Sequence, residues 1–138
     1  MLLVEDNRGD AVLVRMAFKR AKMPGHISVA GTAEIALSML RLEGEHAEAL
    51  RPDLVLLDLN LPYMHGLSFL RVVKAERGLA AIPVIILSSS SAEGDVTASY
   101  EGHANGFITK PISLDDYDDV VTSIGDYWFK LVQTPACR

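Results

Sequence analysis

The stretch Pro52-Asp53-Leu54-Val55-Leu56-Leu57-Asp58-Leu59-Asn60-Leu61-Pro62 is an apolar run that has proline at both ends and leads to the carboxylate of Asp58. A continuous run rich in Val and Leu predicts a strand that is buried on both faces, as in a parallel sheet. Asp58 then lies at the carboxyl end of the strand, where open α/β sheets bind their ligands. Taken alone, an aspartate at this point is equally well a helix N-cap or a surface turn residue.

Length and composition predict one globular domain. The chain has 138 residues, of which 49% are hydrophobic, and its formal net charge is −5. A chain of this length buries roughly 70% of its unfolded surface, so we expect residues 1–138 to form a single domain. The only cysteine, Cys137, cannot form an internal disulfide.

Composition also indicates where the protein works. The chain has no window that approaches the roughly 18 consecutive apolar residues of a membrane span, and no basic segment precedes Glu5 and Asp6 as it does in a secretory signal. We therefore expect a cytoplasmic protein that makes no membrane contact. The negative net charge argues against direct binding of nucleic acid.

Short apolar runs alternate with amphipathic segments along the whole chain. Besides the run already quoted, strands are expected at 1–4, 26–30, 83–87 and 105–109. Helices are expected at about 11–21, 32–42, 66–78 and 92–101 and after residue 113. Their predicted N-terminal signals are caps at Thr32 and Ser113 and a capping box, Ser90-x-x-Glu93. Five strands that alternate with five helices predict a doubly wound α/β domain with a parallel sheet.

Two of these segments carry further expectations. The second helix is expected to carry the apolar residues Ile35, Leu37, Met39, Leu40 and Leu42. The polar residues 43–51 are expected to form a solvated loop. The first strand has only four residues before Glu5, fewer than the usual five or six, so we expect a misassigned start or a trimmed N-terminus.

Polar side chains follow four of the five strands. With the strand order 2-1-3-4-5, one edge of the sheet receives Glu5-Asp6, Asp58, Ser88 and Lys110. Two carboxylates ~4 Å apart repel by about 4 kcal/mol at an effective dielectric constant of 20, so the acids require a cation. Carboxylate oxygens that leave room for water suit Mg²⁺. Lys110 and the Ser88 hydroxyl suit an anionic group on Asp58, which is the arrangement that phosphoryl transfer to a carboxylate needs.

The chain resembles the receiver domains of two-component response regulators over essentially its whole length. Three motifs carry the resemblance: Leu3-Val4-Glu5-Asp6-Asn7, Leu56-Leu57-Asp58-Leu59-Asn60-Leu61-Pro62 and Thr109-Lys110-Pro111. The resemblance implies a flavodoxin-like receiver fold, and it implies that Asp58 is the phosphoacceptor for a phosphohistidine of a sensor histidine kinase. The protein is then a switch whose only chemistry is its own phosphorylation and dephosphorylation.

The resemblance also implies roles for the neighbouring residues. Asp6, Asp58 and the backbone carbonyl of Asn60 are the expected Mg²⁺ ligands, with Glu5 acting directly or through water. Ser88 is expected to move to a phosphoryl oxygen, Lys110 to pair with it, and Phe107 to be the aromatic that follows Ser88. A cis Lys110-Pro111 bond is also implied. The chain departs from the usual family pattern at Glu5, which stands in place of aspartate, and at Ser88, which stands in place of threonine.

A narrower resemblance concerns the signalling partner. The polar segment before Arg51-Pro52-Asp53 and the ending Asp126-Tyr127-Trp128-Phe129-Lys130-Leu131 are similar to stand-alone regulators that work with phytochrome-type histidine kinases in bacteria.

Three alternatives compete with the response-regulator interpretation. A haloacid-dehalogenase-type phosphatase also uses an aspartate, a lysine and Mg²⁺, but its nucleophile lies on the first strand and a cap domain follows. A flavin-binding flavodoxin relative would have its phosphate repelled by Glu5-Asp6-Asn7. A degenerate receiver would act only through protein contacts.

The last helix predicts a contact surface. Its core stripe is expected to contain Tyr117, Val120, Val121, Ile124, Trp128 and Leu131. Tyr127, Trp128 and Phe129 span about 200° of helix surface, so at least one of them projects outward. We expect this surface to serve a homodimer that forms through the final helix and its neighbouring strand. The four histidines, His26, His46, His65 and His103, share no metal-ligand spacing, although His65 is close enough in sequence to Asp58 to contact the site.

Overall fold

A five-stranded parallel sheet forms the centre of the molecule, as predicted. The computed structural model describes residues 1–48 and 51–131. The strand order is β2-β1-β3-β4-β5. The strands are β1 (Leu2–Val4), β2 (Ser28–Ala30), β3 (Val55–Leu57), β4 (Val84–Ser88) and β5 (Gly106–Thr109).

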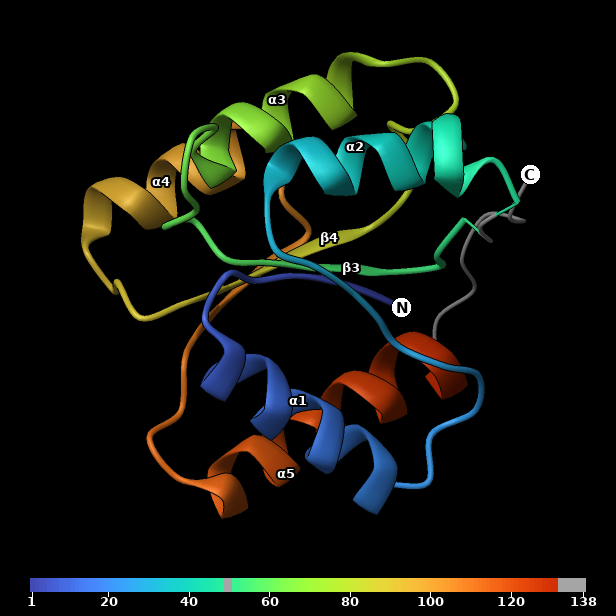
Figure 1. Cartoon of the computed structure of the whole chain (residues 1–138). Helices are drawn as coiled ribbons and strands as arrows, with labels where there is room; N and C mark the ends of the chain where they lie inside the picture. Colours follow the sequence, from blue (N-terminus) through green and yellow to red (C-terminus); the bar gives the residue numbers. More distant parts are fainter. Residues whose placement is uncertain (49–50, 132–138) are drawn as a thin grey trace.

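Helices cover both faces of the sheet (Figure 1). They are α1 (Arg8–Arg20), α2 (Ala33–Arg41), α3 (Gly66–Ala75), α4 (Glu93–Glu101) and α5 (Leu114–Ile124). Helices α1 and α5 lie on one face, and α2, α3 and α4 lie on the other. Each face has its own apolar cluster, with Leu40 and Phe69 in one and Val14 and Tyr117 in the other. Because the inner strands contribute side chains to both clusters, their sequences are continuously apolar.

Local sequence signals account for most helix boundaries. The side chains of Asn7, Thr32 and Ser113 cap α1, α2 and α5 by accepting backbone N–H groups. The predicted capping box of α4 is wrong. Helix α4 begins after Ala92, and the Ser90 hydroxyl instead donates to the Asp95 carboxylate at 2.5 Å.

Only some of the apolar residues of α2 face the sheet. The buried residues of this helix are Ala33, Ala36, Leu37 and Leu40. They follow the i, i+3, i+4, i+7 spacing of one helix face, which leaves Ile35 on the solvent side. Small alanines rather than the larger Ile35 therefore line the contact with the sheet.

The prediction of a cis Lys110-Pro111 bond is also wrong. The described chain contains no cis peptide bond. An X-Pro bond ordinarily adopts the trans form, which is more stable than the cis form by about 0.5–1 kcal/mol. Lys110 reaches the carboxylates near Asp58 from a trans backbone.

The last helix changes its winding after α5. Residues Gly125–Leu131 form a π-helical segment, η2. Tyr127 is 52% exposed, whereas Trp128 and Phe129 pack partly buried against the apolar cluster on the α1 and α5 face. The prediction that one aromatic side chain projects outward is therefore confirmed for Tyr127. The Leu131 side chain and Cys137 lie outside the described residues.

The remaining segments are short. Gly44–His46 form a single 3₁₀ turn, η1, within the segment expected to be a loop. In the part of the chain that the structure describes, no helix is both long and apolar enough to cross a membrane.

Candidate functional site

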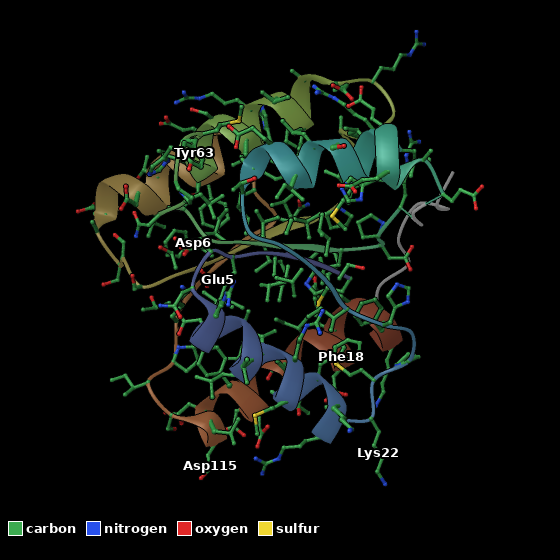
Figure 2. The ribbon with its side chains drawn as sticks, in the orientation of Figure 1. Glu5, Asp6, Phe18, Lys22, Tyr63 and Asp115 are labelled. Carbon is green, nitrogen blue, oxygen red and sulfur yellow. The ribbon has the colours of Figure 1, made fainter. Side chains whose placement is uncertain are left out.

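The candidate site lies at the carboxyl ends of β1, β3, β4 and β5. The parallel register pairs Val4 with Leu57 and Ser88 with Thr109, so the residues that follow these pairs meet at one edge. The backbone N–H of Asp58 donates to the Val4 carbonyl at 3.0 Å, and the N–H of Lys110 donates to the Ser88 carbonyl at 2.7 Å. Figure 2 shows Glu5 and Asp6 at this edge, where the chain leaves β1 for α1.

Three carboxylates of different burial meet there. Glu5, Asp6 and Asp58 each present one oxygen, and these oxygens lie within 4.8 Å of one another. Glu5 is 3% exposed and Asp58 is 5% exposed, while Asp6 faces solvent. Hard oxygen donors with one open side match the preference of a divalent cation that keeps part of its water shell. The donor set therefore fits a divalent metal ion.

Lys110 is the cation that faces these acids. Its Nζ lies 2.5 Å from Glu5 Oε1, 2.9 Å from Asp10 Oδ2 and 3.1 Å from Asp58 Oδ2. Burial by itself lowers the pKa of Lys110, but hydrogen bonds to Asp10 and Glu5 and the nearby negative charges outweigh it and raise that pKa. The ammonium group is therefore firmly charged next to Asp58.

Burial dominates the titration of Glu5. It raises the pKa of Glu5 to about 8, and a hydrogen bond with Asp58 acts in the same direction. Lys110 opposes this shift only partly. A divalent cation bound beside Glu5 would replace the proton that this raised pKa retains, which is the electrostatic reason that the site suits a second cation.

Asp10 is the site residue that the sequence analysis missed. It lies in the first turn of α1 and reaches Lys110 although 100 residues separate the two in sequence. Its spacing of four residues from Asp6 is the signal that could have identified it. In a helix that starts after a strand end, a residue one turn further along lies on the same side of the helix, so its side chain can again face the edge of the sheet.

Ser88, Phe107 and Asn60 surround the charged cluster. Ser88 is fully buried at the end of β4, and its hydroxyl accepts the Ser90 N–H at 3.3 Å. Phe107 lies on β5 and packs partly buried against the apolar cluster below α2, α3 and α4. The Asn60 N–H donates to Asp58 Oδ1 at 3.2 Å, which fixes one oxygen of that carboxylate.

The loop after Asp58 depends on a glycine. A Cβ at Gly66 would lie 2.5 Å from the Asp58 carbonyl oxygen and 2.6 Å from Leu59 Cα. Only glycine lets α3 start this close to the loop. His65 faces α3 and caps it, because its Nδ1 accepts the Leu67 N–H at 3.1 Å. Tyr63, in the same loop, is 91% exposed and has a φ of 65°.

Residues 1–122 match the model of the response regulator receiver domain. The chain belongs to the response regulator receiver family. Membership decides against the haloacid dehalogenase and flavodoxin alternatives. The carboxylates and Lys110 of this receiver domain occupy the ends of the strands at which the sequence motifs had placed them.

Relatives of this receiver domain match nearly the whole chain. Response regulator Rcp1 of Synechocystis is 38% identical over 136 residues, which cover 99% of this chain and 92% of Rcp1. A Mn²⁺-bound crystal structure of Rcp1 covers 98% of this chain and 97% of its own, with a TM-score of 0.90. The crystal structure of the phosphorylated cyanobacterial phytochrome response regulator RcpA is 38% identical, covers 98% of this chain and 96% of its own, and gives a TM-score of 0.92.

A more distant relative has a different stated role. The polar-differentiation response regulator DivK of Brucella anthropi is 31% identical and covers 91% of this chain and 96% of its own.

Proposed function

We propose that this receiver domain accepts a phosphoryl group on Asp58 from a phosphohistidine of a sensor histidine kinase. The observation that carries the proposal is the position of Asp58. Its carboxylate lies 3.1 Å from the ammonium of Lys110 and shares a 4.8 Å cluster with Glu5 and Asp6. A nucleophile, a fixed positive charge and a candidate cation site are the parts that phosphoryl transfer requires.

The transfer step needs little covalent chemistry from the protein. One Asp58 oxygen attacks the phosphorus, and a P–O bond forms while the P–N bond of the phosphohistidine breaks. The electron pair of that bond stays on the imidazole nitrogen. The Asn60 N–H already holds Asp58 Oδ1, so the carboxylate keeps its orientation during the attack. Lys110 then neutralises charge on the transferred group.

The proposed cofactor is Mg²⁺. Glu5, Asp6, Asp58 and the backbone carbonyl of Asn60 would hold it, with Glu5 acting directly or through water. When bound, the ion would neutralise negative charge on the carboxylates and on the phosphoryl oxygens. Glu5 in place of the more usual aspartate moves its carboxylate outward by one methylene group and shifts metal affinity.

Phosphorylation is proposed to switch a surface for a protein partner. It adds about −1.5 to −2 charges at the edge of the sheet where Asp58 is buried. The free energy that couples two sites of a protein is typically about 1–3 kcal/mol. Ser88 and Phe107 are the proposed switch residues, because one ends β4 beside Lys110 and the other lies on the adjoining β5. The chemistry is limited to phosphorylation and self-hydrolysis, and residues 1–138 act as one domain.

The proposed kinase is of the phytochrome type. The support is the likeness to the phytochrome response regulator RcpA over 98% of this chain, together with the similar polar segment and chain ending. The same proposal puts the protein in the cytoplasm without a nucleic-acid ligand. It includes a homodimer formed through the last helix, at which Tyr127 is exposed.

Incubation with acetyl phosphate and Mg²⁺, followed by intact-mass measurement, tests the phosphoacceptor. The wild type is expected to gain one phosphoryl group and the Asp58→Asn variant none. Asp53→Asn is the matched control, since Asp53 is exposed and precedes β3, and it should gain the group as the wild type does. A wild type that stays unmodified, with beryllofluoride also without effect, supports the degenerate-receiver alternative instead.

The kinase proposal needs a separate measurement. A phytochrome-type histidine kinase labelled on its histidine should transfer the label to Asp58 faster than a sensor kinase of another class. Equal rates from both kinases would contradict the proposed partner while leaving the phosphoacceptor role intact.

A further inference from the structure

Among the described residues, three carboxylates surround the ammonium group of Lys110. A lysine ammonium carries three N–H donors. Its Nζ lies 2.5 Å from Glu5, 2.9 Å from Asp10 and 3.1 Å from Asp58, so these acceptors match the donors one to one. The Lys110 side chain is 9% exposed, which leaves little access for water. A phosphoryl group on Asp58 can therefore receive a hydrogen bond from Lys110 only when one of these contacts is given up.

Asp10 differs from the other two partners of Lys110. Glu5 and Asp58 belong to the group of acids that could hold a metal ion, and Asp10 does not. A cation bound by that group would offset the charge of Glu5 and Asp58, whereas Asp10 would keep its full charge. Asp10 is then the strongest remaining competitor for the ammonium group.

The first turn of α1 holds Asp10 in place. Its backbone N–H donates to Asn7 Oδ1 at 3.0 Å, which fixes the start of the helix. The positive end of the helix dipole favours a carboxylate at this position. The Asp10 side chain is 29% exposed and is the most solvent-accessible of the three partners, so water can reach its carboxylate when Lys110 leaves it.

We propose that Asp10 is a positioning residue that holds Lys110 before phosphorylation and then competes with the phosphoryl group for the ammonium hydrogens. The inference rests on the proposed role of Asp58 as phosphoacceptor. Asp10 touches neither the phosphorus nor the metal group in this arrangement. It acts through Lys110, by setting how readily that side chain turns to the phosphoryl oxygens.

Asp10→Asn tests the competition, because it keeps the shape of the side chain and removes its charge. A hydrogen bond to a charged group is stronger than one to a neutral group by about a factor of ten in its equilibrium constant. We therefore expect Asp58 to be phosphorylated about tenfold faster in Asp10→Asn than in the wild type. The gain should appear in the maximal rate with acetyl phosphate and not in its KM, since Asp10 does not contact the donor. Asp10→Glu restores the charge and should return the rate toward that of the wild type.

The assay follows the intact mass of the full chain at several acetyl phosphate concentrations and saturating Mg²⁺. Asp115→Asn is the matched control. It makes the same change in the first turn of α5, and Figure 2 shows Asp115 well away from Glu5 and Asp6. Its rate should equal that of the wild type. In a Lys110→Met background, Asp10→Asn should have no effect on the rate, because the residue through which it acts is gone.

Two results overturn the inference alone. One is a wild type that is phosphorylated while Asp10→Asn reacts at the same rate or more slowly. The other is an acceleration that persists in the Lys110→Met background. If no phosphoryl group enters the wild type, the proposed function fails and the inference fails with it.

A measurement on the unsubstituted protein keeps the test independent of the folding of any variant. The ¹³C carboxyl resonance of Asp10 should shift when beryllofluoride and Mg²⁺ are added, because Lys110 leaves Asp10 for the phosphoryl mimic. A resonance that does not move, in a protein whose Asp58 resonance does, overturns the inference.

Discussion

Replacing Lys110 with methionine should destabilise the metal-free protein by about 3 kcal/mol. Methionine keeps the aliphatic part of the side chain and removes the charge that lies within 3.1 Å of three carboxylates. Removal of one partner from a buried ion pair typically costs about 3–5 kcal/mol. We expect the lower end of that range, because burial raises the pKa of Glu5 to about 8 and this acid can hold a proton instead. Asp10 is also partly exposed, and water solvates it in place of the lysine.

The assay is urea unfolding at pH 7, with EDTA and with excess Mg²⁺. A ligand at about 100 times its Kd stabilises a folded protein by about 2.7 kcal/mol. Mg²⁺ should stabilise Lys110→Met more than the wild type, because the variant has more unbalanced negative charge near the ion. The difference in free energy of unfolding between the two proteins should therefore shrink when Mg²⁺ is present.

Lys19→Met on the exposed side of α1 is the matched control, and its free energy of unfolding should stay within about 0.5 kcal/mol of the wild type. Two results would refute the reasoning. A loss below about 1 kcal/mol in EDTA would mean that Lys110 does not balance the buried acids. An equal loss with and without Mg²⁺ would mean that the ion and the lysine do not neutralise the same charges.

Three further predictions concern other parts of the fold. Tyr117→Phe removes a buried hydroxyl that has no hydrogen-bond partner within residues 1–48 and 51–131, and it should stabilise the protein by about 1 kcal/mol in thermal unfolding at pH 7. The pKa of Tyr117 is raised from 10.0 to about 12, so between these values the folded state keeps a proton that the unfolded state loses. The free energy of unfolding of the wild type should therefore fall as pH rises from 10 toward 12, and that of Tyr117→Phe should fall less steeply. Gly66→Ala places a Cβ 2.5 Å from the Asp58 carbonyl oxygen and should cost about 1–3 kcal/mol in urea unfolding, whereas Gly94→Ala, whose Cβ meets open space, should cost nothing. Tyr127→Ala should shift a homodimer toward monomer in sedimentation, and an unchanged sedimentation coefficient would argue against the last helix as the interface.

Periodicity and strand-end chemistry were enough to predict the architecture. Continuous apolar runs at 54–57 and 84–87 belong to strands buried on both faces, and that pattern distinguishes a parallel from an antiparallel sheet. The acids after β1 and β3 and the lysine after β5 are adjacent to these runs in sequence. Their convergence follows from the strand order, so Glu5, Asp6, Asp58 and Lys110 could all be predicted.

Features that depend on particular side-chain contacts escaped prediction. Ile35 has the apolar character of a core residue, but the rotation of α2 on the sheet buries Ala33 and Ala36 instead. Ser90 has the spacing of a capping box, but the Asp95 carboxylate binds its hydroxyl. For Ile35 the packing of α2 on the sheet outweighed a local preference, and for Ser90 a contact with a residue five positions away did so, because local preferences are worth only about 1 kcal/mol or less.

The sequence by itself determined the order of strands and helices, the edge at which the site lies and the chemistry of its acids and its lysine, because each of these follows from residues that are neighbours along the chain. Only the tertiary structure decided that Asp10 reaches Lys110, that the Tyr117 hydroxyl is buried with no partner in the described part of the chain, and that Gly66 must have no side chain. These depend on distances between elements far apart in sequence. Such distances are set by how helices pack on a twisted sheet, and a local pattern such as the four-residue spacing of Asp6 and Asp10 does not fix them.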